Sequence, residues 1–244
     1  MLKTWFHRWG SPPWFYRMSG KLLPWLGAAA FLLLLIGSVW GLAVAPEDAR
    51  QGNSYRIIYI HVPSAFLALA GYYLMAIAGC IGLVWRIKLA FWALRAAAPP
   101  GAAMTFIALI TGSFWGKPTW GTWWEWDARI TSMLILFFLY LGVMALANAY
   151  QNTDNGNRAA SVLALVGTVN IPIIYMSVKW WNTLHQGATL KLTSASTIDP
   201  SMLQPLWVMI VGFYCLYAVL LLLNLRCEIL SNERNSRWLI DLFN

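Results

Sequence analysis

The chain has 244 residues, of which 59% are hydrophobic and 11% are charged, and its net charge is +8. Soluble domains carry about a quarter charged residues, so this composition excludes a water-soluble globular protein and predicts an integral membrane protein. The positive charges are spread over loops and termini and form no basic stripe studded with aromatic side chains. They therefore indicate contact with the lipid bilayer and no nucleic-acid partner.

Six apolar stretches are long enough to cross a bilayer, because a helical span needs about 20 residues. The first ends near a small-residue site that resembles a signal-peptide cleavage site, but its apolar run is longer than a signal core and Pro46 follows directly. The predicted fold class is all-α, a polytopic membrane protein in which residues 1–244 form a single domain of six transmembrane helices. The predicted spans are 22–45, 59–85, 89–114, 128–149, 159–178 and 203–225.

Basic residues predict the orientation of these spans. Eleven lie in the two tails and in the second and fourth loops, and six lie in the first, third and fifth loops. The positive-inside rule therefore predicts that both termini are cytoplasmic and that the odd-numbered loops lie outside. The eleven are Lys3, Arg8, Arg17, Lys21, Arg86, Lys88, Arg95, Arg158, Arg226, Arg234 and Arg237, and the six are Arg50, Arg56, Lys117, Arg129, Lys179 and Lys191.

Prolines interrupt two of the predicted spans. Residues 99–101 read Pro-Pro-Gly inside the third span, and residues 170–172 read Asn-Ile-Pro inside the fifth. Each proline removes a backbone hydrogen bond, so both spans are predicted to kink. Asn170 is predicted to face the bundle interior, where it either joins helices or serves a function.

The third predicted loop is an unusual tryptophan tract. Residues 115–127 read WGKPTWGTWWEWD and hold five of the sixteen tryptophans. Water-facing loops favour small polar residues, so this segment is expected to lie against a bilayer surface or a planar ligand. Trp120, Trp123, Trp124 and Asp127 follow helical spacing, which predicts a short amphipathic helix on the outer face. Such a segment is either a ligand platform or an interfacial anchor.

Two of the three histidines are predicted to lie on the same outer face as this tract. His7 lies in the N-terminal tail, whereas His61 lies near the start of the second span and His185 lies in the fifth loop. A lone histidine in a membrane protein is most often a packing residue or an interface anchor. Two histidines beside an aromatic shelf favour a joint role, because imidazole binds haem iron and a porphyrin stacks on indole rings.

Three charged residues near the predicted outer boundary have alternative roles. Arg56 and Arg129 are predicted either to pair with carboxylates such as haem propionates or to anchor the boundary. Asp127 is predicted to cap the fourth span, to accept the second N–H of an imidazole, or to pair with Arg129. Capping is the simplest of these roles, because the fourth span begins directly after Asp127.

Several segments together resemble a known family. The tryptophan tract is similar to the WWD signature of the haem-handling proteins of cytochrome c maturation. The length, the six spans and the two outer histidines resemble the heme exporter protein C (CcmC) family. The resemblance covers essentially the whole chain and includes RIIYIHVP, FIALITGSFWGKP, WEWDARITS and VKWWNTLHQG.

The resemblance implies a haem site that faces the periplasm in the bacterial inner membrane. His61 and His185 would be axial ligands of a transiently bound haem b, and the haem would be delivered to a haem chaperone of the CcmE type. Further implied partners are ABC-type ATPase and permease subunits of the CcmA and CcmB types and a small membrane subunit of the CcmD type. The implied haem platform consists of Trp115, Trp120, Trp123, Trp124, Trp126 and Asp127.

Two other functions remain open at this point. In the first, the chain is a transport subunit that carries haem or another substrate through the bundle, for which Asn170, Thr105, Thr111 and the prolines give weak support. In the second, the chain is a redox protein resembling a b-type cytochrome, which would need histidine pairs inside the bundle. No catalytic nucleophile or acid–base group is visible, so no enzyme is expected.

Overall fold

The structure is a computed structural model that describes residues 10–150, 153–181, 183, 185 and 198–243. Within these residues it is helical and has no strand. Six segments are long and apolar enough to cross a membrane, which confirms the predicted all-α, six-span class. These segments are Pro12–Val44, Asn53–Trp85, Lys88–Trp120, Ala128–Ala149, Thr153–Trp180 and Pro200–Glu233.

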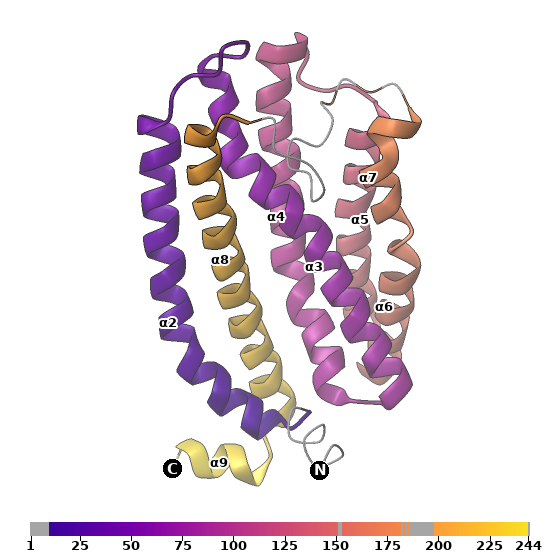
Figure 1. Ribbon diagram of the computed structural model, residues 1–244. Helices are drawn as coiled ribbons and strands as arrows, with labels where there is room; N and C mark the ends of the chain where they lie inside the picture. Colours follow the sequence, from indigo (N-terminus) through magenta and orange to yellow (C-terminus); the bar gives the residue numbers. More distant parts are fainter. Residues whose placement is uncertain (1–9, 151–152, 182, 184, 186–197, 244) are drawn as a thin grey trace.

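The helices pack side by side as a bundle (Figure 1). α2 packs against α8, α3 packs against α4 in the centre, and α5 packs against α6 and α7. The start of α2 and the short α9 lie at one end of the bundle, and the connection from α4 to α5 lies at the other. The elements are α2 (Pro12–Val39), η1 (Trp40–Val44), η2 (Asn53–Ile57), α3 (Ile58–Trp85), α4 (Lys88–Trp120), α5 (Ala128–Ala149), α6 (Thr153–Gly167), α7 (Asn170–Trp180), α8 (Pro200–Glu233) and α9 (Arg237–Phe243).

Several helices are longer than the apolar stretches that predicted them. α4 ends at Trp120, whereas the predicted span ended at residue 114, and α8 extends beyond the predicted range 203–225 at both ends. Hydropathy marks the part of a helix that matches the hydrocarbon layer, and the backbone remains helical beyond it. Of the residues used to predict orientation, Lys3, Arg8 and Lys191 lie outside the described residues, as does His7.

The prolines have different effects in the third and fifth spans. The fifth span is interrupted between Gly167 and Asn170, where α6 ends and α7 begins. α4 instead runs without a break through Pro99 and Pro100. Pro100 has no N–H to donate to the carbonyl four residues earlier, that of Ala96. Asn224 of α8 satisfies this carbonyl through Nδ2 at 3.2 Å, so the lost helical bond becomes a contact between helices.

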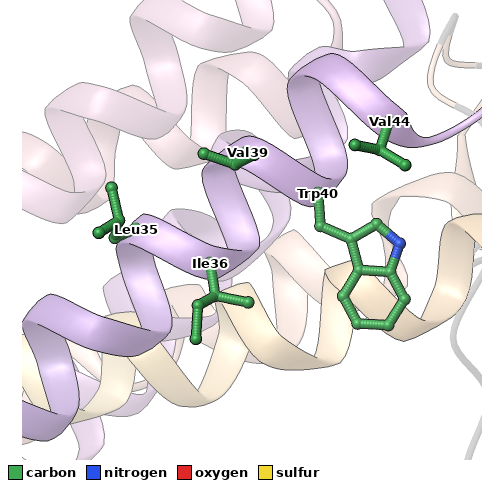
Figure 2. A pocket seen from close by; sticks show the side chains of 5 residues that line it. All are labelled: Leu35, Ile36, Val39, Trp40 and Val44. Carbon is green, nitrogen blue, oxygen red and sulfur yellow. The ribbon is translucent and has the colours of Figure 1, made fainter.

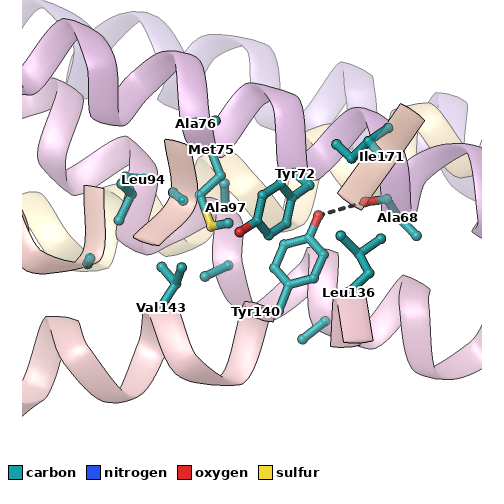
Figure 3. Close-up of a cluster of buried hydrophobic side chains, with 14 of the residues drawn as sticks. Ala68, Tyr72, Met75, Ala76, Leu94, Ala97, Leu136, Tyr140, Val143 and Ile171 are labelled. Carbon is teal, nitrogen blue, oxygen red and sulfur yellow. Dashed lines mark hydrogen bonds between the residues drawn. The ribbon is translucent and has the colours of Figure 1, made fainter. Parts of the chain in front are cut away.

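Alanines, larger aliphatic side chains and two tyrosines form the core between α3, α4, α5 and α6 (Figure 3). The rings of Tyr72 and Tyr140 meet edge to face with their centroids 5.0 Å apart, and the Tyr140 hydroxyl donates to the Ala68 carbonyl at 2.8 Å. A Cβ at Gly101 would lie 2.3 Å from the Tyr140 ring, so only glycine allows α4 to approach α5 here.

Asn170 is buried at the start of α7 and faces the bundle interior, as predicted. Its Nδ2 donates to the Ser132 carbonyl at 2.8 Å, which joins α7 to α5. A hydrogen bond of this kind between membrane helices satisfies a polar group that would otherwise be stranded in the hydrocarbon layer. Asn170 therefore joins helices, the simpler of the two roles predicted for it.

Candidate functional site

The tryptophan tract does not form the predicted short helix. α4 continues to Trp120, and Gly121 ends it in a left-handed conformation with φ at +80° and its N–H bonded to the Lys117 carbonyl at 3.1 Å. The five residues from Thr122 to Trp126 are non-helical, and Asp127, with an extended backbone, is the N-cap of α5. The left-handed Gly121 ends one helix and Asp127 begins the next, so the periodic pattern spans a helix end, a non-helical segment and a helix start. The prediction that Trp120, Trp123, Trp124 and Asp127 share one helical face is therefore wrong.

The tract instead divides into indoles that contact the histidines and indoles that are exposed. Trp115 packs edge to face on His61 with ring centroids 5.6 Å apart, and Trp120 packs on His185 at 4.8 Å. Trp123 and Trp126 are 53% and 71% exposed. One part of the tract therefore supports the two imidazoles, and the other presents apolar surface to its surroundings.

His61 lies in the first turn of α3 and faces α4. Its Nδ1 is 3.0 Å from the Thr111 hydroxyl oxygen, and that hydroxyl donates its own proton to the Ile107 carbonyl at 2.6 Å. A hydroxyl has one proton, so Thr111 accepts from His61 and fixes the proton of the neutral imidazole on Nδ1. The lone pair of His61 is therefore on Nε2. A Cβ at Gly112 would lie 3.1 Å from Cε1 of His61, so the missing side chain gives the ring its room.

His185 has a different partner. Its Nδ1 lies 3.3 Å from Oδ2 of Asp127, a carboxylate that accepts only, so Nδ1 is again the protonated nitrogen. Oδ1 of the same carboxylate accepts from the Ile130 backbone N–H at 2.8 Å and caps α5. Asp127 therefore fills two of its three predicted roles at once, because it caps the helix and orients an imidazole.

Burial and the charge of Arg129 favour the neutral form of His185. Burial lowers the pKa of His185, and the positive charge of Arg129 lowers it further. The Asp127 carboxylate acts in the opposite direction, but the net effect is a pKa below the ordinary value. Within the described part of the chain, the Arg129 guanidinium forms no ion pair with Asp127. The site therefore combines a neutral imidazole with a nearby cation.

Arg56 has a structural role at the same end of the bundle. Its two terminal nitrogens donate to the carbonyls of Leu42 at 2.5 Å and Ala45 at 2.7 Å. These carbonyls belong to the end of η1, where no further helical N–H follows to satisfy them. Arg56 thus fastens η1 to η2, so its predicted pairing with a propionate stays a prediction.

Three residues that contact this site were not predicted to belong to it. Thr111 and Gly112 contact His61, and Gln51 accepts a hydrogen bond from Nε1 of Trp115 at 2.6 Å. Thr111 and Trp115 are four residues apart and therefore share one face of α4. This spacing is visible in the sequence and could have linked Thr111 to the site. The role of Gln51 depends on the fold of the first loop, for which the sequence carries no such signal.

The site offers two imidazoles, which suits an iron whose other ligands are the nitrogens of a porphyrin. The described residues contain no group of three or more His, Cys, Asp or Glu side chains that could hold a bare metal ion. A neutral imidazole with a lone pair on Nε2 is a ligand type that would hold a haem iron. Nε1 of Trp124 is buried without a hydrogen-bond partner among the described residues, and such an orphaned donor fits a ligand with acceptor groups.

A second feature of the surface lies away from the histidines. An apolar groove of about 380 Å³ runs along α2 and η1 and shares no residue with the site; Figure 2 shows the side chains that line it. Apolar side chains exposed on a membrane helix face lipid, so this groove is an ordinary part of the lipid-facing surface. It is lined by Leu35, Ile36, Val39, Trp40 and Val44.

Comparison with known proteins gives matches over nearly the whole chain. The family model described as heme exporter protein C matches residues 5–240. The chain is 51% identical to heme exporter protein C of Escherichia coli (strain K12) over 242 residues, which cover 99% of this chain and 97% of that protein. It is 48% identical to the Haemophilus influenzae protein over 96% of this chain and 95% of the relative. For the Bradyrhizobium diazoefficiens protein the identity is 51% over 93% and 86%.

Proposed function

This chain belongs to the heme exporter protein C family, and on that basis we propose that it holds haem between His61 and His185 and passes it to a haem chaperone. Membership of the family implies haem handling in cytochrome c maturation by a multi-pass membrane protein. In the proposal, the site faces the periplasm from the bacterial inner membrane, and haem b is a transient cargo.

The observation that supports the proposal is that both imidazoles are held in the same tautomer, with the proton on Nδ1. Each places its Nδ1–H on an oxygen acceptor, Thr111 for His61 and Asp127 for His185. With Nδ1 as the protonated nitrogen in both rings, each Nε2 keeps its lone pair. Ligating histidines in haem and metal proteins are held in the same way, by a hydrogen bond from the second ring nitrogen.

The remaining residues have supporting roles in this proposal. Trp115 and Trp120 pack against the imidazoles and hold the rings in place. Trp123, Trp124 and Trp126 offer apolar ring area, and each aromatic contact adds about 0.5 to 1.5 kcal/mol beyond the area it buries. Arg129 is the cation best suited to a propionate, because Arg56 already binds backbone carbonyls.

A site with exposed indoles suits transfer better than storage. Trp123 and Trp126 are open on one side, so a bound porphyrin would keep an edge accessible to an acceptor protein. Holding and releasing haem needs no bond to be made within the porphyrin, and we therefore propose a non-enzymatic role. The proposed partners are the chaperone, the ATPase and permease subunits, and a small membrane subunit.

The polar residues that favoured transport through the bundle have structural partners. Thr105 donates to the Gly101 carbonyl at 2.8 Å and Asn170 donates to Ser132. Thr111 donates within its own helix and accepts from His61. These contacts favour the proposal of a site at one end of the bundle over a pathway across it.

The proposal is tested by haem transfer in reconstituted vesicles. The purified protein is loaded with haem and mixed with the soluble domain of the chaperone, and the haem absorption of each partner is followed after separation. We expect transfer from the unaltered protein and from His7→Ala, and no loaded haem in the double variant His61→Ala, His185→Ala. Haem that cycles redox state but never leaves would favour a b-type cytochrome, and a protein that binds no haem would favour transport.

A further inference from the structure

The two histidines at the site have unequal hydrogen-bond partners. His185 donates to an Asp127 carboxylate that is buried, with a side chain only 5% exposed. His61 donates to the neutral Thr111 hydroxyl. A hydrogen bond to a carboxylate draws the Nδ1 proton away from the ring and makes Nε2 a stronger donor, whereas a bond to a neutral hydroxyl has a smaller effect.

The partner of His61 is held by its own helix. Thr111 donates to the Ile107 carbonyl at 2.6 Å, so its hydroxyl proton is committed and its lone pair is aimed at the imidazole. Gly112 lies beside the ring and Trp115 packs on it edge to face. Three positions of one stretch of α4 therefore fix the tautomer and the orientation of a ring that belongs to α3.

We propose that Thr111 is the positioning residue of His61, and that its neutral hydroxyl makes His61 the weaker iron ligand and the one displaced first at handover. The proposal rests on the haem-holding function proposed above. In the exchange, the bond between iron and Nε2 of His61 breaks and its electron pair stays on the nitrogen. A lone pair from the incoming ligand then fills the same position, so no oxidant or reductant is consumed.

The first test needs no haem. The tautomer of each histidine is read from ¹⁵N chemical shifts of the haem-free protein in detergent, with signals assigned through single histidine variants. We expect the Nδ1–H tautomer for His61 in the unaltered protein and in Thr111→Ser, and its loss in Thr111→Val. The matched control is Thr105→Val, which removes a hydroxyl bonded to its own helix in the same way but away from the histidines. An unchanged tautomer in Thr111→Val would overturn the positioning role.

The second test identifies the ligand that leaves. Carbon monoxide is added to the ferrous haem-loaded protein, and the iron–histidine stretch that remains after photolysis is measured by resonance Raman spectroscopy. We expect this frequency to fall in Asp127→Ser and to stay constant in Thr111→Val, because the retained ligand is His185. The reverse pattern would show that His61 is retained and would overturn the order of release.

The rate of haem transfer to apomyoglobin connects the tautomer of His61 with the order in which the ligands leave. Loss of an outer hydrogen-bond partner typically costs about 10- to 100-fold in metal affinity, so haem should move from Thr111→Val to apomyoglobin about tenfold faster than from the unaltered protein. Thr111→Ser should restore the slow rate, and equal rates for all three would contradict the proposal. If the unaltered protein binds no haem, it is the haem-holding function that fails, whereas the haem-free tautomer measurement still tests the position of Thr111.

Discussion

Replacement of Asp127 by asparagine should invert the tautomer of His185 without unfolding the protein. Oδ1 of Asp127 accepts from the Ile130 N–H at 2.8 Å, and an asparagine oxygen caps a helix equally well. This cap fixes the orientation of the amide, because the Ile130 N–H must face the oxygen. The amide NH₂ then occupies the place of Oδ2, which lies 3.3 Å from Nδ1 of His185. A donor at this place forces Nδ1 to accept, and the ring proton moves to Nε2.

In Asp127→Asn the helix cap is kept and the hydrogen bond from His185 to a carboxylate is lost, and these two facts set the expected changes in stability and haem affinity. Helix capping changes by only a few tenths of a kcal/mol, so thermal stability should be almost unaltered. The hydrogen bond to the carboxylate is worth about 1.5 to 3 kcal/mol, and a protonated Nε2 has no lone pair for iron. Haem affinity should therefore fall by at least about 10- to 100-fold.

Asp127→Ser is the matched control for this variant. Serine is also a good N-cap, but it places neither a carboxylate nor a donor against His185. Haem affinity measured by titration should rank the unaltered protein above Asp127→Ser, and Asp127→Ser above Asp127→Asn, with similar melting temperatures for all three. Equal affinities of the two variants would refute the tautomer argument, and wild-type affinity of Asp127→Asn would refute the role of Asp127 altogether.

Three further predictions concern other parts of the bundle. Gly112→Ala should lower haem affinity severalfold, because its Cβ crowds the adjacent imidazole, whereas Gly27→Ala, with nothing within 4 Å, should leave haem titrations unchanged. Asn224→Leu should cost about 0.6 to 1.7 kcal/mol in the free energy of unfolding in detergent, because it strands the carbonyl freed by a proline. Arg129→Gln should raise the pKa of His185 in an NMR titration of the haem-free protein, since the Arg129 charge lowers that pKa. The variant should thus protonate His185 at a higher pH than the unaltered protein, and an unchanged or lower pKa would contradict this.

Hydropathy predicted the number of spans because the hydrocarbon layer imposes a length and a composition on each of them. It did not predict where helices end, since α4 and α8 continue beyond the apolar residues. Prolines predicted a kink in both the third and the fifth spans. The fifth span is interrupted just before Asn170, whereas α4 stays helical through Pro99 and Pro100. The sequence alone does not reveal that Asn224, 128 positions further along the chain, satisfies the Ala96 carbonyl that Pro100 frees.

At the site, too, the sequence predicted the residue types but not where the helices end or which distant residues meet. Periodicity placed Trp120, Trp123, Trp124 and Asp127 on one helix, but Gly121 ends α4 within that pattern. Asp127 was assigned alternative roles, and the structure combines two of them because a carboxylate has two oxygens that face different neighbours. Thr111 lies one helical turn before Trp115, so the sequence could have placed it on the same helix face as the tryptophan. Its contact with His61 could not be predicted in this way, because the two residues are 50 positions apart in the chain.

Electron paramagnetic resonance of the ferric haem-loaded protein tests whether His61 and His185 together bind the iron of one haem, as we propose. We expect a low-spin signal of bis-imidazole type in the unaltered protein and conversion to high-spin in either single alanine variant. Added imidazole should restore the low-spin signal in each single variant. A low-spin signal that persists in both single variants without added imidazole would contradict the claim.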